Sequence, residues 1–388
     1  MAITIAQATP RDWLQLKEEI RGHAPSLGID KIGFASADPF AEMKQILLEH
    51  RAKGYESGFE EPDIDKRVDP GLSFAEPRSI IAIAVAYPSR LDDEPRSAPG
   101  AYRGLISRSA WGRDYHHVLR DRLSRLETFI RERVSDARVE SMVDTGALVD
   151  RAVAVRAGIG WSGKNCATIT PEWGSWVYLG EMITNLPFPP DTPITDQCGE
   201  CTLCIDACPT GALVGPGQLN AKRCLSFVTQ TKGEVADELK EKLGNRLYGC
   251  DTCQLVCPFN KGKHFNHQPE FEPEPERVKP LLKPLLAMNN REFKEKYGDS
   301  AAAWRGRKPI QRNAIIALGN YRDKSAVPEL ARVLADDPRP DIRAAAAWAL
   351  GKIGGEEARE SVAQAIPKER DEHVKEELRK AYERLGGV

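Results

Sequence analysis

The residues best suited to chemistry are cysteines: the chain of 388 residues holds nine, and eight of them lie between Cys198 and Cys257. Two residues separate Cys198 from Cys201 and Cys201 from Cys204, and Cys208 follows after three more, directly before a proline. Three thiolates at this spacing can wrap three corners of a [4Fe–4S] cube, while the cysteine before proline reaches a neighbouring cluster. The spacing therefore predicts iron–sulfur chemistry.

A second run, Cys250-x2-Cys253-x3-Cys257, has the same ending, but Leu247 occupies the place of its first cysteine. Cys224, between the two runs, is the thiol available to replace it. Exchange of the last cysteine of each run is typical of two-cluster ferredoxins. We therefore predict a ferredoxin-like module with two [4Fe–4S] clusters, one held by Cys198, Cys201, Cys204 and Cys257, the other by Cys250, Cys253, Cys224 and Cys208.

Disulfides and zinc are the alternatives for these cysteines. Disulfides are typical of exported proteins, and the N-terminus MAITIAQATPRDW lacks the basic stretch and apolar core of an export signal. Zinc sites use separated CxxC pairs without the x3-Cys-Pro ending. The ninth cysteine, Cys166, is expected to be a small buried apolar residue, with a redox or ligand role as the alternative.

Strands and helices alternate over the first 190 residues. Residues 79–87 form a continuous apolar run rich in Ile and Val, typical of a strand buried on both faces. Apolar patterns predict further strands at 31–36, 139–144 and 174–184, and amphipathic helices at 13–20, 116–134 and 147–158. This order predicts an α/β domain over residues 1–190, with helices on the faces of a mixed or parallel sheet.

Proline-rich segments divide the rest of the chain. Residues 186–197 carry four prolines, and HQPEFEPEPERVKP follows the cysteines, so we place the ferredoxin-like domain at 191–265. Residues 278–388 are predicted to be helical. The triplet Ala-Leu-Gly occurs at 317–319 and 349–351, 32 residues apart, which is typical of HEAT-like repeats. So few repeats should pack against the preceding domain.

The net charge of −2 gives no argument for nucleic-acid binding by the whole chain. Residues 278–325, however, hold 11 Lys or Arg against 4 Asp or Glu, interspersed with Phe293, Tyr297 and Trp304. Such a segment can neutralise phosphates and stack on bases, although a solvated helical face is the alternative. The basic residues in question are Lys294, Lys296, Arg305, Arg307, Lys308 and Arg312.

No apolar stretch approaches the roughly 18 residues that a membrane-spanning helix needs. Without such a stretch or an export signal, we expect a cytoplasmic protein, and we expect it to be a monomer.

Several segments outside the cysteine runs carry a narrower resemblance. They are ISRSAWGRDYHHVL (106–119), VDTGALVDRAVAVRAGIGWSGKN (143–165), CGECTLCIDACPTGAL (198–213), RCLSFVTQ (223–230) and GCDTCQLVCPFN (249–260). In order and spacing the chain resembles the epoxyqueuosine reductase family over most of its length. The cysteine runs are shared with many ferredoxins, whereas WGRDYH together with DTG and GWSGKN is far more specific.

The resemblance implies a corrinoid-binding N-terminal domain, a two-cluster module and HEAT-like helices. It implies that an epoxide on a modified wobble base of tRNA, epoxyqueuosine, is reduced to the alkene of queuosine. The cofactor would be cobalamin, fed by the two clusters from an external low-potential electron donor. Removing the oxygen takes electrons that no side chain can supply, and the leaving oxygen needs a proton from a general acid.

Asp144 is the candidate for that acid, because it ends a predicted strand and precedes Thr-Gly. A carboxylic acid that stays protonated near neutral pH needs a raised pKa, which the apolar corrin plane would provide by desolvation. The alternative is that Asp144 only caps a helix beginning at Ala147.

The resemblance also implies further contacts to the cofactor. We expect Ser107 on the upper side of cobalt and no histidine below it, since no Asp-x-His-x-x-Gly motif occurs. Tyr115 and His116 would line the pocket, unless this histidine is simply a surface residue at a helix start. Arg67 would reach the corrin or the substrate, or else be solvated. The remaining candidates are Lys164, Asn165, Thr168, Ser226, Cys250 and Asp251.

Two other functions compete with this one. A corrinoid reductive dehalogenase would share the cofactors, but a small organohalide would not require the basic helical segment. An electron carrier fused to a HEAT interaction module would leave the N-terminal domain without a role.

Overall fold

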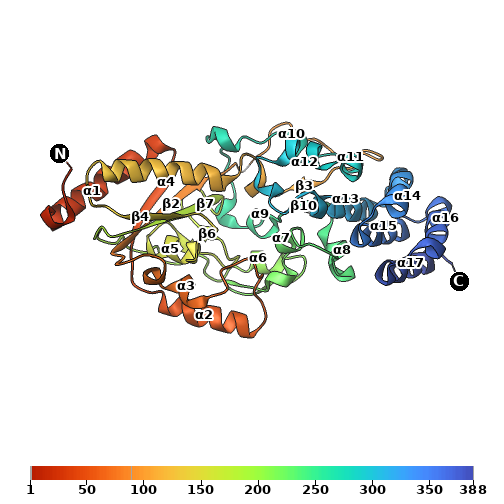
Figure 1. The fold of residues 1–388 in the computed structure, drawn as a ribbon, viewed down its shortest axis with the longest axis horizontal. Coiled ribbons are helices and arrows are strands. Elements are labelled where there is room, and N and C mark those ends of the chain that lie inside the picture. Colours follow the sequence, from red (N-terminus) through yellow and green to blue (C-terminus); the bar gives the residue numbers. More distant parts are fainter. Residues whose placement is uncertain (1, 89, 388) are drawn as a thin grey trace. The chain divides into compact units, whose positions relative to one another are not determined.

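The structure is a computed structural model that describes residues 2–88 and 90–387 (Figure 1). The chain forms two compact units, one of residues 1–90, 113–222 and 252–271, the other of residues 91–112, 223–251 and 272–388. These units differ from the three predicted segments, because the cysteine-rich residues 191–265 contribute to both. Among the described residues, no helix combines the length and apolar character that a membrane crossing requires.

The first unit is built on a four-stranded sheet. Its strands are β1 (Lys31–Ser36), β2 (Ser79–Ala86), β7 (Val177–Thr184) and β4 (Val139–Met142), in that order across the sheet. Every neighbouring pair is antiparallel, so the expectation of a mixed or parallel sheet was wrong. β2 is buried along its whole length, and a strand covered on both faces has the same apolar composition whichever way its neighbours run.

Helices cover both faces of this sheet (Figure 1). α1 (Pro10–His23) and α4 (Tyr115–Arg131) enclose one apolar core, in which Ile20 and Leu123 pack with Met182 of β7. On the other face lie α2 (Ala41–Ala52), α3 (Ile64–Val68) and α5 (Asp150–Arg156), where Val153 packs with Ile183 of β7. Both faces of β7 are therefore buried.

The remaining elements of the first unit are short, and two of them, α6 (Leu203–Asp206) and α9 (Thr252–Leu255), contain cysteines. The others are η1 (Ile5–Gln7), η2 (Ala24–Leu27), η3 (Pro70–Leu72), β5 (Trp161–Ser162), β6 (Thr168–Ile169), β8 (Leu213–Gly215), β9 (Gln218–Leu219), η6 (Pro258–Asn260) and η7 (Pro269–Phe271). β5 and β6 form an antiparallel hairpin, as do β8 and β9.

The second unit is mainly helical. A parallel pair of strands, β3 (Leu105–Ile106) and β10 (Arg246–Tyr248), accompanies α7 (Leu225–Val228), α8 (Asp237–Leu243) and the helices that end the chain. Those helices are α10 (Pro275–Val278), α11 (Leu282–Ala287), α12 (Asn290–Tyr297), α13 (Arg307–Tyr321), α14 (Val327–Asp336), α15 (Pro340–Ile353), α16 (Glu356–Ala365) and α17 (Glu372–Arg384). Single 3-10 turns of this unit are η4 (Arg108–Ala110), η8 (Ala301–Ala303), η9 (Lys324–Ala326) and η10 (Ile366–Lys368), while η5 (Ala221–Arg223) spans the boundary between the two units.

Buried polar side chains join α13 to the segment that carries Cys224 and Cys250. Asn313 donates to the carbonyls of Thr229 and Leu247, both at 2.8 Å. Buried amides with both donors satisfied fix the position of the groups that accept from them. The helical array therefore packs on the preceding segment, as its small number of repeats predicted.

The Ala-Leu-Gly repeat reflects close helix packing. A Cβ on Gly319 of α13 would lie 2.8 Å from the ring of Trp348 in α15. A Cβ on Gly351 of α15 would lie 2.9 Å from the Cα of Ala381 in α17. The spacing of the triplets thus corresponds to successive helices that stack on one another through a glycine.

We expect Gly351→Ala to destabilise the second unit by about 1–3 kcal/mol, because the added methyl group meets backbone that cannot move aside. Gly22→Ala in α1 is the matched control: its Cβ would have no atom within 4 Å, so the better helix former should stabilise by up to about 1 kcal/mol. Thermal unfolding of both variants measures the difference, and a stabilising Gly351→Ala would contradict this packing.

Candidate active site

The four predicted ligands of the first cluster converge in the first unit. Cys198, Cys201, Cys204 and Cys257 line one cavity together with Lys164, Asn165, Ile169, Pro258 and Phe259. No disulfide joins any of the described cysteines. Four thiols around one small apolar cavity are the donor set that a [4Fe–4S] cluster requires.

The walls of this cavity come from the β5–β6 hairpin. Trp161 and Ile169 are buried against Cys257, and the ring of Trp161 meets Phe259 edge-on at 4.8 Å between centroids. Asn260 then ties the cysteine run to the sheet domain, because its Oδ1 accepts from the Ser175 backbone N–H at 2.8 Å. The cavity is therefore held by rigid, buried neighbours.

The residues after GWSG lie at this cavity. Lys164 donates from Nζ to the Gly199 carbonyl, between the first two cysteines of the cluster. Asn165 and Thr168 are only 7% and 5% exposed, yet Asn165 Nδ2 and Thr168 Oγ1 are buried without a hydrogen-bond partner. Buried donors without a partner in the protein can donate to a bound group.

The ligands predicted for the second cluster belong to both units. In the first unit, the Cys208 sulfur accepts from the Ala212 N–H at 3.2 Å, and Cys253 lies in α9. In the second unit, Cys224 precedes α7 and Cys250 follows β10. The assignment of these four thiolates to one cluster stays a prediction.

Asp144 lies on a tight loop between β4 and α5. Its φ of +55° is unusual for a residue other than glycine, and its side chain is 61% exposed. Tyr115 donates to Asp144 Oδ2 at 2.9 Å, and His116 Nε2 lies 3.3 Å from the same oxygen. Since α5 begins at Asp150 and not at Ala147, Asp144 does not cap this helix.

His116 is held between two carboxylates. Its Nδ1 lies 2.6 Å from Asp114, the N-cap of α4, while its Nε2 faces Asp144. Both ring nitrogens can donate only in the imidazolium form. Burial works against this charge, but the hydrogen bonds to Asp114 and Asp144 outweigh it and raise the pKa of His116 to about 9.

The described side chains by themselves favour an ionised Asp144, and the raised pKa expected from the corrin plane stays a prediction. The hydrogen bond from His116, helped by Tyr115, outweighs burial and lowers the pKa of Asp144 below its usual value. At neutral pH the proton therefore rests on His116, beside an ionised Asp144. Sequence reasoning missed Asp114 in this role, although an aspartate just before the expected helix start is a recognisable cap.

Two acids behind Asp144 were also missed. The Asp144 backbone N–H donates to Asp150 Oδ2 at 3.0 Å, and Asp150 in turn shares a hydrogen bond with Glu181 of β7. A glutamate inside the apolar run WVYLGEMIT was the signal that could have found this pair.

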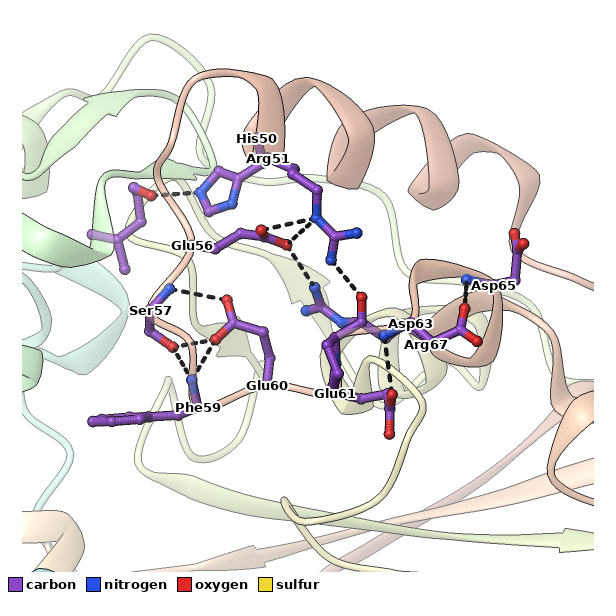
Figure 2. Close-up of polar contacts among 12 residues, drawn as sticks. His50, Arg51, Glu56, Ser57, Phe59, Glu60, Glu61, Asp63, Asp65 and Arg67 are labelled. Carbon is purple, nitrogen blue, oxygen red and sulfur yellow. Dashed lines mark hydrogen bonds and ion pairs between the residues drawn. The ribbon is translucent and has the colours of Figure 1, made fainter.

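Arg67 is neither solvated nor unpaired. Its side chain is 14% exposed and lies 3.9 Å from Glu56, which also accepts from Arg51 Nε (Figure 2). Figure 2 shows that Glu56 lies between the two guanidinium groups. Burial, against the attraction of Glu60 and Glu56, lowers the pKa of Arg67 from its usual value. The backbone carbonyl of Arg67 also accepts from the Val149 N–H at the start of α5.

The second unit holds the other predicted cofactor contacts. Ser107 is buried, and a Cβ on Gly249, whose φ is +72°, would lie 2.0 Å from its Oγ. Asp251 accepts from the Arg108 backbone N–H at 3.0 Å. Ser226 is half-buried in α7. Gly249 therefore leaves space over Ser107 that no other residue would leave.

The basic segment is less uniform than its charge count indicated. Arg312 is only 2% exposed, and its guanidinium donates to the carbonyls of Val228, Thr231 and Gly233. It therefore has a structural role, and its assignment to tRNA binding was wrong. Lys308 pairs with Asp341 at 2.7 Å.

Other members of the segment remain accessible. Lys294 is exposed, Lys296 and Arg305 are half-exposed, and the Trp304 ring is 50% exposed with Arg305 over its face. Arg307 is half-buried and donates to the Met288 carbonyl.

Three family models match the chain. They are described as 4Fe-4S double cluster binding domain (residues 197–260), Epoxyqueuosine reductase QueG, DUF1730 (residues 67–145) and HEAT repeats (residues 305–383). Epoxyqueuosine reductase of Bacillus anthracis is 59% identical over 374 residues, 96% of this chain and 98% of that protein. The chain belongs to the epoxyqueuosine reductase family.

Two solved structures of epoxyqueuosine reductase extend this similarity. One, with an epoxyqueuosine-modified tRNA-Tyr stem loop, is 59% identical with a TM-score of 0.95, covering 97% of this chain and all of that one. The other, from Bacillus subtilis, has an aspartate-bearing catalytic loop swung out of the active site; it is 59% identical with a TM-score of 0.94, covering 96% of this chain and all of that one.

The membership confirms the predicted enzyme class, the fold class and the double-cluster module. Such identity over nearly the whole chain favours an epoxyqueuosine reductase over a dehalogenase or a simple electron carrier.

We expect the anaerobically purified protein to hold about eight iron atoms, as two four-iron cubes. Cys257→Ala, in the first cavity, and Cys224→Ala should each reduce this to about four, because each removes one thiolate from a different cluster. Cys166→Ala is the control and should retain all the iron. Iron and sulfide analysis measures the content, and full iron in Cys224→Ala would refute its place in the second cluster.

Proposed function

We propose that this protein reduces epoxyqueuosine in tRNA to queuosine, with cobalamin as cofactor and Asp144 as the residue that delivers a proton to the leaving oxygen. The observation that carries the proposal is the exposed Asp144 carboxylate beside a protonated His116. Relatives at 59% identity are epoxyqueuosine reductases, and one was solved with a modified tRNA stem loop.

Two buried donors of the first unit fit an amide-bearing cofactor. Asn165 Nδ2 and Thr168 Oγ1 have no hydrogen-bond partner among the described residues, and the corrin side chains are rich in amide acceptors. Tyr115 stacks on Tyr178 of β7 at 4.4 Å and is thereby fixed beside Asp144. Bound cobalamin would supply a low-potential metal centre able to deliver two electrons to the epoxide carbon.

Contacts from Arg67, Lys164, Ser107, Ser226, Cys250 and Asp251 remain proposals that rest on the family resemblance. Lys164 lines the cavity of the first cluster, so we expect it to contact that cluster before any other cofactor.

Proton delivery follows from the arrangement of side chains. Asp144 is ionised at rest, and His116 carries the proton on Nε2, 3.3 Å away. When negative charge develops on the leaving oxygen, the proton on His116 Nε2 can move to Asp144 and from Asp144 to that oxygen, which leaves His116 neutral. Asp114 favours the imidazolium form, so His116 takes up a new proton from solvent at neutral pH.

The electrons enter from outside the chain. We propose an external low-potential donor that reduces the two clusters, and a monomeric, cytoplasmic enzyme.

We propose that the accessible basic residues form the surface that binds tRNA. Lys294, Lys296, Arg305 and Arg307 would contact phosphates, and Trp304 offers a ring for stacking. The target base must leave its stack to reach a buried cofactor, so loop contacts of this kind are required.

The decisive experiment incubates tRNA bearing epoxyqueuosine with protein, cobalamin and a low-potential reductant, followed by nucleoside mass spectrometry. The wild type should yield queuosine. Asp144→Asn keeps the shape but cannot carry the proton, so turnover should fall by about 10²–10⁴ while both clusters and cobalamin still bind. Near-normal turnover would show that another group delivers the proton, and lost cobalamin would show a structural role for Asp144.

A double variant, Lys294→Ala with Arg305→Ala, should weaken tRNA binding and lower its salt slope by roughly one unit per lost phosphate contact. Lys368→Ala in the last 3-10 turn, an exposed lysine outside the basic segment, is the control and should bind as the wild type does. Binding isotherms at several salt concentrations measure both quantities. Unchanged affinity in the double variant would place the RNA surface elsewhere.

A further inference from the structure

A glutamate occupies the centre of the sheet in the first unit. Glu181 of β7 pairs with Ala82 of β2 on one side and Met142 of β4 on the other. It is 1% exposed and lies on the face of β7 that also carries Leu179 and Ile183, within an apolar core. An ionised carboxylate in such a place would cost several kcal/mol unless a cation neutralised it.

The partner of Glu181 is a second acid. Its carboxyl group shares a hydrogen bond with Asp150, the first residue of α5, while Oε1 is buried and has no hydrogen-bond partner. Two carboxyl groups in contact cannot both be ionised at low cost, because the like charges repel; a proton between them relieves this.

Asp150 reaches the catalytic loop. Its Oδ2 accepts a hydrogen bond from the Asp144 backbone N–H at 3.0 Å. The same residue, Asp144, has a φ of +55°. A non-glycine residue in this conformation needs its surroundings to hold it there. Gly146 adds to the constraint, because a Cβ there would lie 2.6 Å from the Cβ of Met142.

The charged groups on the surrounding elements do not neutralise the pair. Asp144 adds a further negative charge. The cations nearby have other partners: Arg67 of α3 lies beside Glu56, Arg151 of α5 donates to the Cys166 carbonyl, Arg120 of α4 donates to Thr145, and His116 lies between Asp114 and Asp144. Glu140, on β4, is exposed.

Burial and the neighbouring negative charges raise the pKa values of both acids and so decide which of them carries the shared proton. Burial raises the pKa of Glu181 well above its usual value, with Asp150 adding to the effect. Burial also raises the pKa of Asp150 to about 6, and the hydrogen bond from Glu181 partly offsets this rise. Near neutral pH, Glu181 is thus the neutral donor and Asp150 the ionised acceptor.

We propose that Glu181 and Asp150 hold one proton between them, and that this pair is the positioning element that keeps Asp144 in its catalytic conformation. The second half of this statement rests on the proposed function of Asp144; the first half does not. Glu181 acts through Asp150, which acts on the backbone of Asp144, and neither acid needs to touch substrate.

The proton is tested without cofactor or tRNA. Infrared spectra at neutral pH should show the C=O band of a protonated carboxylic acid, shifted in D2O, that disappears in Glu181→Gln. Glu140→Gln, which alters an exposed carboxylate on the neighbouring strand, is the control and should leave this band unchanged. A band that survives Glu181→Gln would overturn the shared proton. This outcome does not depend on the proposed function of the enzyme.

The positioning role is tested by turnover. Glu181→Gln keeps a donor to Asp150, so turnover and its pH profile should stay within about threefold of wild type. Glu181→Met has similar volume but no donor, so the pKa of Asp150 should rise by about one unit, the worth of one hydrogen bond. Since the ionised form of Asp150 holds the loop, the acidic limb of turnover should move to higher pH by the same amount.

Asp150→Ala completes the set. It removes the acceptor for the Asp144 N–H, so kcat should fall at least tenfold while the KM for tRNA stays within about twofold. Identical pH profiles for Glu181→Gln and Glu181→Met, or an unchanged kcat in Asp150→Ala, would overturn the positioning role. If Glu181→Met fails to fold, the infrared test and Asp150→Ala still decide.

Discussion

The position of His116 between two carboxylates is the interaction on which the site depends. An imidazole that donates from both nitrogens must be charged, and this charge in turn keeps Asp144 ionised although it lies near further acids. The site therefore keeps its proton on His116 and not on Asp144, the residue that we propose meets the substrate. If Asp144 itself had a raised pKa, the site would also hold one proton. In that case, however, no neighbouring group would return a proton to Asp144 after transfer.

The antiparallel sheet explains where this arrangement can form. β4 has only four residues and lies at the sheet edge, so the chain leaves the sheet at Met142 and turns sharply through Asp144 to α5. The central strand β7 passes beneath this turn and supplies two supports from opposite faces: Tyr178, on which Tyr115 stacks, and Glu181, which meets Asp150. A single strand thus fixes both the Tyr115 ring and the backbone beside the Asp144 carboxylate, the proposed proton donor.

Sequence alone predicted the parts of the site that depend on local spacing. The first cluster follows from cysteines two residues apart, and only Cys257 had to be placed by analogy with crossover in ferredoxins. Strand direction was not predictable, because the apolar run of β2 is the same in either kind of sheet. The charge on His116 could not be predicted either. It depends on Asp144, which is 28 residues away in the sequence but lies 3.3 Å from His116 Nε2 in the structure. Glu181 showed a signal, an acid inside an apolar strand, but its partner could not be known.

Arg312 shows why a charge count over a segment is an incomplete argument for an RNA surface. Its side chain reaches three backbone carbonyls of the segment that follows Cys224, and burial lowers its pKa to about 10. A buried guanidinium is retained only where it satisfies carbonyls that would otherwise lack donors. Together with Asn313 it fixes the end of α7, the residues that follow α7, and Leu247 of β10, and so the neighbouring chain that carries Cys224 and Cys250. The buried residues of the basic segment therefore hold the cysteine-bearing chain in place, and only its exposed residues belong to the surface that we propose for tRNA phosphates.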